Sequence, residues 1–168
     1  MSEEIKNRVA ASGVITFDLE DFYVEGERVA FDIKPLLEYE LILREKPFRE
    51  FVKNNDWTTF SGKHVAVCCS SDAIVPVWAY MLLVAALEPF AKTIVYGDLD
   101  KLEEKLFLNS LAAVDWTVYS GSRIFVKGCS KVRVPEGVFV EVTARLKPFV
   151  SSLMFGEPCS AVPVFKKK

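Results

Sequence analysis

Short apolar runs and longer helical patterns alternate along most of the chain. The runs KHVAVCC (63–69) and TIVYG (93–97) are rich in β-branched residues, which predicts strands. Between them, AIVPVWAYMLLVAAL (73–87) has no charged residue and places apolar side chains all round a helix, which predicts burial on every side. The segment 98–115 has apolar residues at helical spacing and predicts an amphipathic helix. Strands separated by helices indicate an α/β fold with βαβ crossovers and a parallel or mixed sheet.

The same pattern occurs twice in the chain. DWTTFSGKHVAV (56–67) matches DWTVYSGSRIFV (115–126) without a gap, at an offset of 59 residues. Because the matched residues fall in turns, caps and strands alike, two copies of one structural unit explain the match. The copy relation also predicts a helix for GVFVEVTARL (137–146), although its β-branched residues favour a strand by local propensity.

Residues 1–37 differ from the two copies. GVITFDLEDFY and ERVAFDI predict two strands joined by a Glu25-Gly26 turn, and hence an N-terminal β-hairpin added to the edge of the sheet. We therefore expect a single domain over residues 1–168. It would consist of the N-terminal strands (1–37), a first repeat unit (38–96) and a second repeat unit with the C-terminal tail (97–168).

Composition and charge narrow the function class. The chain has 168 residues, of which 51% are hydrophobic, and its net charge of −2 gives no electrostatic case for nucleic-acid binding. The N-terminus has no apolar signal region, and the longest uncharged run is shorter than the roughly 18–20 residues that span a bilayer. We expect a cytoplasmic protein that does not bind a membrane. In a reducing compartment, its four cysteines favour metal binding, redox chemistry or core packing over disulfides.

Three Cys-Ser pairs follow predicted strands, which places Cys69, Cys129 and Cys159 at one carboxyl edge of the sheet. Three thiolates at one edge predict a metal centre, either an iron–sulfur cluster or zinc. Residues near these thiols would complete or orient the site, namely Ser70, Asp72, Ser130 and Ser160. Cys68 is expected on the opposite face of its strand, and His64 at the surface, at the wrong end of the strand for a ligand.

Other interpretations remain open at this point. Buried cysteines also pack as small hydrophobes at strand–helix corners. One low-pKa cysteine could act as the nucleophile of a thiol enzyme or as a sulfur carrier. The apolar surplus could instead cover a partner of a non-catalytic binding module or homo-oligomer. The acidic cluster Asp18, Glu20 and Asp21 alternates with apolar residues, which favours a solvated face over a metal site. No motif names a reaction or a substrate.

Several segments, which together cover most of the chain, resemble a bacterial family known mainly from Bacteroidetes and catalogued as a domain of unknown function, DUF2480. They are NRV (7–9), DLEDFY (18–23), LREKPFR (43–49), SDAIVPVWAYML (71–82), KGCS (127–130) and SLMFGEPCSAVP (152–163). The resemblance implies no established activity. It does imply proximity to genes for iron–sulfur assembly, and so a cluster-binding or sulfur-handling role for Cys69, Cys129 and Cys159, with iron–sulfur assembly proteins as partners. Cys68 lies outside the family pattern.

Overall fold

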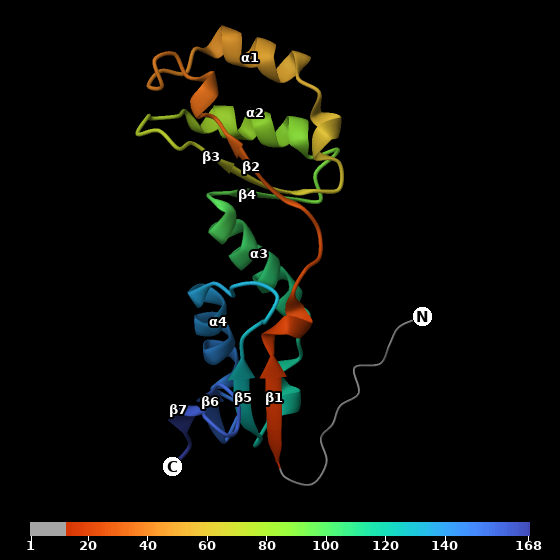
Figure 1. Ribbon diagram of the computed structural model, residues 1–168, viewed down its shortest axis with the longest axis vertical. Coiled ribbons are helices and arrows are strands. Elements are labelled where there is room, and N and C mark those ends of the chain that lie inside the picture. Colours follow the sequence, from red (N-terminus) through yellow and green to blue (C-terminus); the bar gives the residue numbers. More distant parts are fainter. Residues whose placement is uncertain (1–12) are drawn as a thin grey trace. The chain divides into compact units, whose positions relative to one another are not determined.

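The computed structural model describes residues 13–168 and divides the chain into two compact units (Figure 1). Unit 2 is continuous and comprises Glu25–Lys105. Unit 1 combines the chain up to Val24 with Leu106–Lys168, so unit 2 is an insertion in the sequence of unit 1. No helix formed by residues 13–168 combines the length and the apolar character that a membrane span requires.

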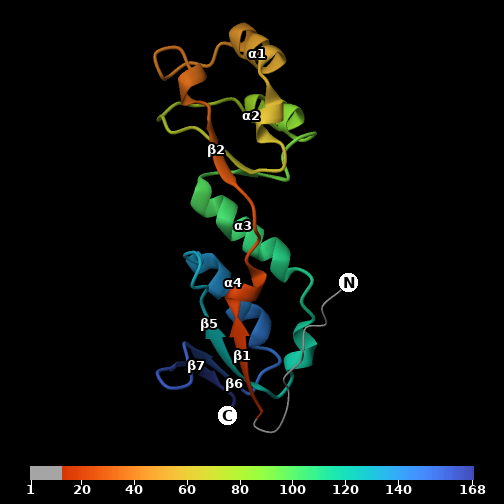
Figure 2. The same ribbon diagram turned by 45° about the vertical axis from the view of Figure 1, so that its right-hand side comes forward.

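Unit 2 is built on a three-stranded parallel sheet with the order β2-β3-β4. Its strands and helices are β2 (Arg28–Asp32), α1 (Glu45–Asn54), β3 (His64–Cys68), α2 (Val77–Leu87), β4 (Thr93–Tyr96) and the start of α3 (Leu99–Leu111). Two short 3-10 turns, η2 (Lys34–Leu36) and η3 (Trp57–Phe60), join them. The helices α1 and α2 lie on the same side of the sheet, as Figures 1 and 2 both show.

The first turns of α3 cover the other face of this sheet. Side chains along a strand alternate between its two faces, so Arg28 lies on the face opposite to Phe31, which packs under α1 and α2. The Arg28 guanidinium donates to both carboxylate oxygens of Glu103 in α3, at 2.9 and 3.0 Å. Leu102, one residue earlier, is fully buried. Both faces of the unit 2 sheet are therefore covered.

Unit 1 repeats this plan with one further strand. Its sheet has the order β1-β5-β6-β7, in which the first three strands are parallel and β7 is antiparallel to β6. Its elements are β1 (Val14–Asp18), η1 (Leu19–Phe22), the end of α3, η4 (Trp116–Tyr119), β5 (Arg123–Lys127), α4 (Glu136–Leu146), β6 (Ser152–Phe155) and β7 (Val162–Lys166). The helix predicted over 137–146 is confirmed as α4.

Equivalent elements of the two units begin and end at the offset found in the sequence. Strand β3 corresponds to β5, α2 to α4, and β4 to β6, each displaced by the same 59 residues. Loop hydrogen bonds are repeated as well: Gly62 N–H donates to the Phe90 carbonyl and Gly121 N–H to the Phe149 carbonyl, both at 2.9 Å. The offset is thus a structural repeat and holds through loops as well as strands. Positions related by it are called equivalent below.

Each unit has its own hydrophobic core, and the two cores match position by position. Phe48 in unit 2 and its equivalent Phe107 in unit 1 are 2% and 1% exposed and are among the largest buried side chains. Trp57 packs at the predicted helix–strand corner, where its indole N–H donates to the Val52 carbonyl at 2.9 Å. Its equivalent, Trp116, packs against the core of unit 1.

The structure differs from the predicted arrangement of the first strands. Both N-terminal strands are present, but they do not pair with each other: β1 pairs in parallel with β5, and β2 pairs in parallel with β3. The predicted turn at Glu25-Gly26 is the point where the chain passes from unit 1 to unit 2. Each unit thereby gains an edge strand of its own, and there are two sheets rather than one. That the whole chain behaves as a single domain stays a prediction.

We expect Phe48→Ala to lower the free energy of unfolding of unit 2 by about 3–5 kcal/mol, because it leaves a cavity in a closed core. Hydrogen exchange followed by mass spectrometry would then show faster exchange concentrated in the peptides of β2, β3 and β4. The matched variant Phe107→Ala should have the reverse effect, with faster exchange in β1, β5 and β6. Equal loss of protection in both units after either substitution would contradict separate cores.

Candidate functional site

The carboxyl ends of the parallel strands form one edge of each sheet, where ligands of α/β proteins commonly bind. In unit 2 this edge carries Asp32 at the end of β2, Cys68 at the end of β3 and Tyr96 at the end of β4. In unit 1 the equivalent ends of β5 and β6 carry Lys127 and Phe155. The two copies thus share a backbone plan and differ in chemistry at this edge.

Asp32 is fixed by the loop that follows β3. Its carboxylate accepts hydrogen bonds from the Ser70 hydroxyl at 2.5 Å, from the Ser70 N–H at 2.9 Å and from the Lys34 N–H at 2.9 Å. Partial burial raises the pKa of Asp32, but these three hydrogen bonds outweigh it, so the pKa lies below its ordinary value. Asp32 is therefore a charged group that holds the loop and is already saturated with donors.

Two adjacent thiols lie beside this carboxylate. Cys68 and Cys69 are both half-buried and free. Burial raises the pKa of Cys68, and the charges of Asp32, Cys69 and Asp98 raise it further. The sulfur of Cys69 lies 3.5 Å from the Ser71 hydroxyl and packs against the core of unit 2. Cys68 is thus a protonated thiol at neutral pH, the opposite of the low-pKa nucleophile that a thiol enzyme requires.

A pair of tyrosines completes the edge of unit 2. The rings of Tyr80 in α2 and Tyr96 in β4 meet edge to face, with centroids 5.1 Å apart. Burial, followed by the neighbouring Tyr96 and Cys69, raises the pKa of Tyr80 to about 12. In unit 1 the equivalent rings are Phe139 and Phe155, which meet in the same way at 5.7 Å. The stacking is thus common to both copies, whereas the hydroxyl groups occur only in unit 2.

The edge of unit 1 is a network of ion pairs. The Lys127 ammonium lies 3.0 Å from Asp18, and this hydrogen bond is the largest cause of the raised pKa of Lys127. Glu20 accepts from the Ser130 hydroxyl at 2.9 Å and lies 3.7 Å from Lys131. The prediction of a solvated acidic face is therefore wrong for Asp18 and Glu20, whose side chains are 24% and 29% exposed and are paired.

The predicted metal ligands lie in both units. Cys69 belongs to unit 2, whereas Cys129 and Cys159 belong to unit 1. Cys129 packs against the core of unit 1, and Cys159 is exposed. Over residues 13–168, no group of three or more His, Cys, Asp or Glu side chains is arranged to hold a metal ion. The three-thiol centre stays a prediction.

The other predicted site residues also have clear places. Ser70 binds Asp32 and Ser130 binds Glu20, so each joins the loop after a middle strand to the first strand of its unit. Asp72 and Ser160 are exposed. His64, expected at the surface, is 1% exposed, with its Nε2 atom 3.2 Å from the Glu25 carbonyl. It lies at the amino end of β3, away from the thiols.

The Cys-Ser pairs are not equivalent in the fold. Strand β3 ends at Cys68 and β5 ends at Lys127, so the residue equivalent to Cys69 is Gly128, and the residue equivalent to Cys129 is Ser70. The sequence alignment that matched Cys69 to Cys129 needed a one-residue shift, and the structure has no such shift. Two neighbouring thiols at the end of the middle strand are therefore a property of unit 2 alone.

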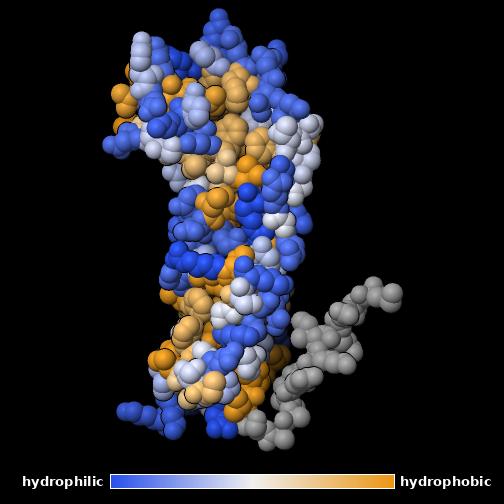
Figure 3. Space-filling model, in the orientation of Figure 1, coloured by the Kyte–Doolittle hydropathy of each residue, from blue (hydrophilic) through white to orange (hydrophobic). Residues whose placement is uncertain are grey.

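The outer face of α2 is a second feature found in only one copy. The sequence predicts that α2 is buried on every side, and this is wrong: Val77 and Met81 are 73% and 67% exposed, and Val84 is 39% exposed. Ile74, just before the helix, is 94% exposed. Hydrophobic colour extends across the part of unit 2 where α2 lies (Figure 3). We call these four residues the α2 face.

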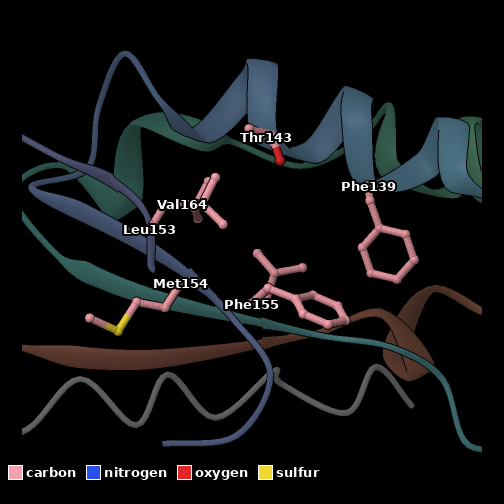
Figure 4. A pocket seen from close by; sticks show the side chains of 7 residues that line it. Phe139, Thr143, Leu153, Met154, Phe155 and Val164 are labelled. Carbon is pink, nitrogen blue, oxygen red and sulfur yellow. The ribbon is translucent and has the colours of Figure 1, made fainter. Parts of the chain in front are cut away.

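A small apolar pocket lies in unit 1. It has a volume of about 260 Å³ and opens between α4, β6 and β7 (Figure 4). Phe139, Leu153 and Phe155 form most of its wall, and Thr143 supplies the one hydroxyl group. Ligand sites usually measure about 300–1,000 Å³ and carry several convergent polar groups. The pocket is therefore a weaker candidate than the thiols or the α2 face.

Comparison with known proteins gives a family and no activity. The family model described as "Protein of unknown function (DUF2480)" matches residues 3–167. A search of curated proteins and a search of solved structures each found no match.

We expect Asp98→Asn to raise the rate of Cys68 alkylation at pH 8 by about twofold, because it removes one of the charges that disfavour the thiolate. Asp98 also accepts from the Lys101 N–H at the start of α3, and asparagine caps a helix equally well, so folding should be unaffected. Mass spectrometry of iodoacetamide-treated protein measures the rate at Cys68. The control Asp72→Asn should leave it unchanged, and a slower reaction of Asp98→Asn would contradict the assignment.

Proposed function

Because the chain belongs to the DUF2480 family of proteins of unknown function, its function has to be argued from its own residues, and we propose that it is a cytoplasmic accessory protein that binds another polypeptide through the α2 face. Four free thiols are consistent with a reducing compartment. Iron–sulfur assembly proteins, which the family resemblance implies, are one partner class within this proposal.

The observation that carries the proposal is the contrast between two equivalent surfaces. Ile74, Val77 and Val84 of the α2 face are replaced in unit 1 by Arg133, Glu136 and Thr143. The Arg133 guanidinium donates to both carboxylate oxygens of Glu136, at 2.6 and 2.8 Å. The fold therefore accepts a charged, solvated surface at this position, and the packing of α2 does not require apolar residues on its outer side.

An exposed apolar helix face has a physical cost that needs a counterpart. Each of the four side chains would gain free energy by leaving water, at roughly 25 cal/mol per Å² of apolar area. Contiguous exposed apolar patches of a few hundred Å² mark interaction sites. No charged residue lies between Val77 and Leu87, so nothing along the helix opposes burial against another chain.

Thiol-based binding of a soft metal or an iron–sulfur cluster is the second candidate. It is favoured by the adjacent Cys68 and Cys69 at the edge of unit 2, where unit 1 has Lys127 and Gly128. Thiolates are the preferred protein ligands of such metals. Cys129 and Cys159 would form a separate pair of ligands in unit 1, so the two pairs are tested separately. The rival role, a thiol nucleophile, is disfavoured at Cys68 by its raised pKa.

Site-specific crosslinking tests the docking proposal. With Met81 replaced by p-benzoylphenylalanine, we expect ultraviolet irradiation of expressing cells to give a covalent adduct of defined mass, because the α2 face is in contact with another chain. The same residue placed at Val140, which is equivalent and 70% exposed, is the matched control and should give no such adduct. Mass spectrometry identifies the crosslinked chain.

A variant that copies unit 1 strengthens this test. Ile74→Arg/Val77→Glu/Val84→Thr gives α2 the surface that α4 already carries, so we expect the protein to fold and the adduct at Met81 to disappear. Equal adduct formation at Met81 and Val140, or an adduct that persists in the triple variant, would defeat the docking proposal.

Metal analysis tests the second candidate. We expect anaerobically purified protein, reconstituted with iron and sulfide or with zinc, to retain metal, and Cys68→Ser/Cys69→Ser to lose the share held by unit 2. Cys129→Ser/Cys159→Ser measures the share held by unit 1. Elemental analysis and the visible absorption spectrum provide the readout. Metal content that is zero before and after reconstitution would end this candidate and leave the docking proposal intact.

A further inference from the structure

We propose that the polypeptide covering the α2 face is a second copy of this chain, which packs its α2 antiparallel to the first about a twofold axis. This inference rests on the proposed function and names its partner. It follows from the spacing of the exposed residues, from the charges at the two ends of α2 and from the area of the face.

The spacing of the exposed residues is palindromic. Val77, Met81, Val84 and Glu88 follow one another at intervals of four, three and four residues, which places them in one stripe along the outer side of α2. All four are exposed, whereas Ala79, Leu83 and Leu87 on the opposite side are buried.

Read backwards, a stripe with these intervals has the same spacing. Two antiparallel copies related by a twofold axis therefore place Met81 against the Val84 of the partner, and Val77 against the partner's Glu88. A twofold contact of this kind requires a surface that matches itself, and alternating intervals of four and three residues are those of helix–helix seams.

The charges at the ends of α2 favour the antiparallel arrangement. In the isolated chain α2 has no acidic residue in its first turn, no side-chain cap at its N-terminus and no basic residue in its last turn, and Glu88 lies at its C-cap. A carboxylate at a helix C-terminus is unfavourable, whereas one at an N-terminus is stabilising. An antiparallel second copy moves the partner's Glu88 next to the N-terminus of α2 and so supplies the missing charge.

The equivalent helix α4 needs no such partner. It carries Glu136 in its first turn and Arg145 in its last turn, so its own side chains complement the dipole at both ends. Arg145 also donates to Glu141 at 2.7 Å, and the Lys147 ammonium lies over the ring of Phe165. The charged groups of α4 are satisfied inside unit 1, and Val140 alone is a large exposed hydrophobic residue on that helix.

The size of the face sets the strength of the contact. The α2 stripe with Ile74 offers a few hundred Å² of apolar surface, below the roughly 800 Å² per partner of a standard interface. Ala85 is exposed beside the stripe, and its small side chain permits close approach of the two helices. We therefore expect a dimer that dissociates on dilution, with a dissociation constant in the micromolar range.

Sedimentation velocity of the full chain over a concentration series tests the inference. We expect the unmodified protein to change from monomer to dimer, and Met81→Lys or Val84→Glu alone to weaken the dimer at least about tenfold, because each buries an unpaired charge. The double variant Met81→Lys/Val84→Glu places each lysine against the partner's glutamate and should recover most of the affinity. An equimolar mixture of the two single variants should form a heterodimer for the same reason.

Controls separate a failed fold from a failed inference. The substituted side chains are exposed, so circular dichroism should show unchanged melting, and Val140→Lys on α4 should leave the dimer intact. A chain that stays monomeric at every concentration, or single variants that dimerise like the unmodified protein, would overturn the inference. Loss of dimer without recovery in the double variant and in the mixture would also overturn it, since it excludes the antiparallel register.

The two proposals fail in different ways. A monomer in sedimentation together with an adduct of another protein at Met81 would refute the second copy and keep the docking function. An adduct with twice the mass of the chain would support both. The absence of any adduct at Met81, together with a monomer in sedimentation, would refute both.

Discussion

Burial of one sheet face under two helices is the constraint on which the rest of this structure depends. In each unit a middle strand supplies two fully or nearly fully buried β-branched residues to the core, Val65 and Val67 in unit 2 and Ile124 and Val126 in unit 1. Two helices close over them with a phenylalanine each time, Phe48 or Phe107. Because close-packed interiors tolerate little change in volume, the inward-facing positions of both copies stay similar.

That constraint gives the differences between the copies their meaning. A residue that packs inward is limited by its neighbours, whereas a residue at the strand ends or on the outer side of a helix is limited only by solvent or by a partner. Unit 1 uses these free positions for ion pairs such as Asp18–Lys127 and Arg133–Glu136. Unit 2 uses them for thiols, phenols and an apolar stripe. The copy with the ordinary solvated surface therefore serves as an internal reference for the specialised one.

Much of the fold could be predicted from the sequence, because the repeat carried information that local propensity lacks. The β-branched residues of α4 favour a strand when read alone, and the match to α2 identified the helix. The N-terminal strands could not be placed in the same way. A turn signal between two strands indicates an antiparallel hairpin, but β1 and β2 find parallel partners far along the chain, and local residues do not encode such distant pairing.

The site was harder to predict, because it depends on register and on which units the residues join. Matching Cys69 to Cys129 by their shared Cys-Ser pairs required a one-residue shift, and in a strand such a shift moves a side chain to the other face. The division of the three cysteines between two units follows from the insertion of unit 2 within unit 1, which the chain order conceals.

The exposed face of α2 shows what a hydrophobic pattern records. A helix that is apolar all round is one that is buried all round where the protein works, and the pattern does not say which chain provides the cover. In the isolated chain three of its apolar positions, Val77, Met81 and Val84, are exposed. The prediction of full burial is therefore wrong for one copy and, on our proposal, holds for two. An antiparallel partner would bury the same side chains that the sequence assigned to an interior and would bring a carboxylate to the helix N-terminus that lacks one.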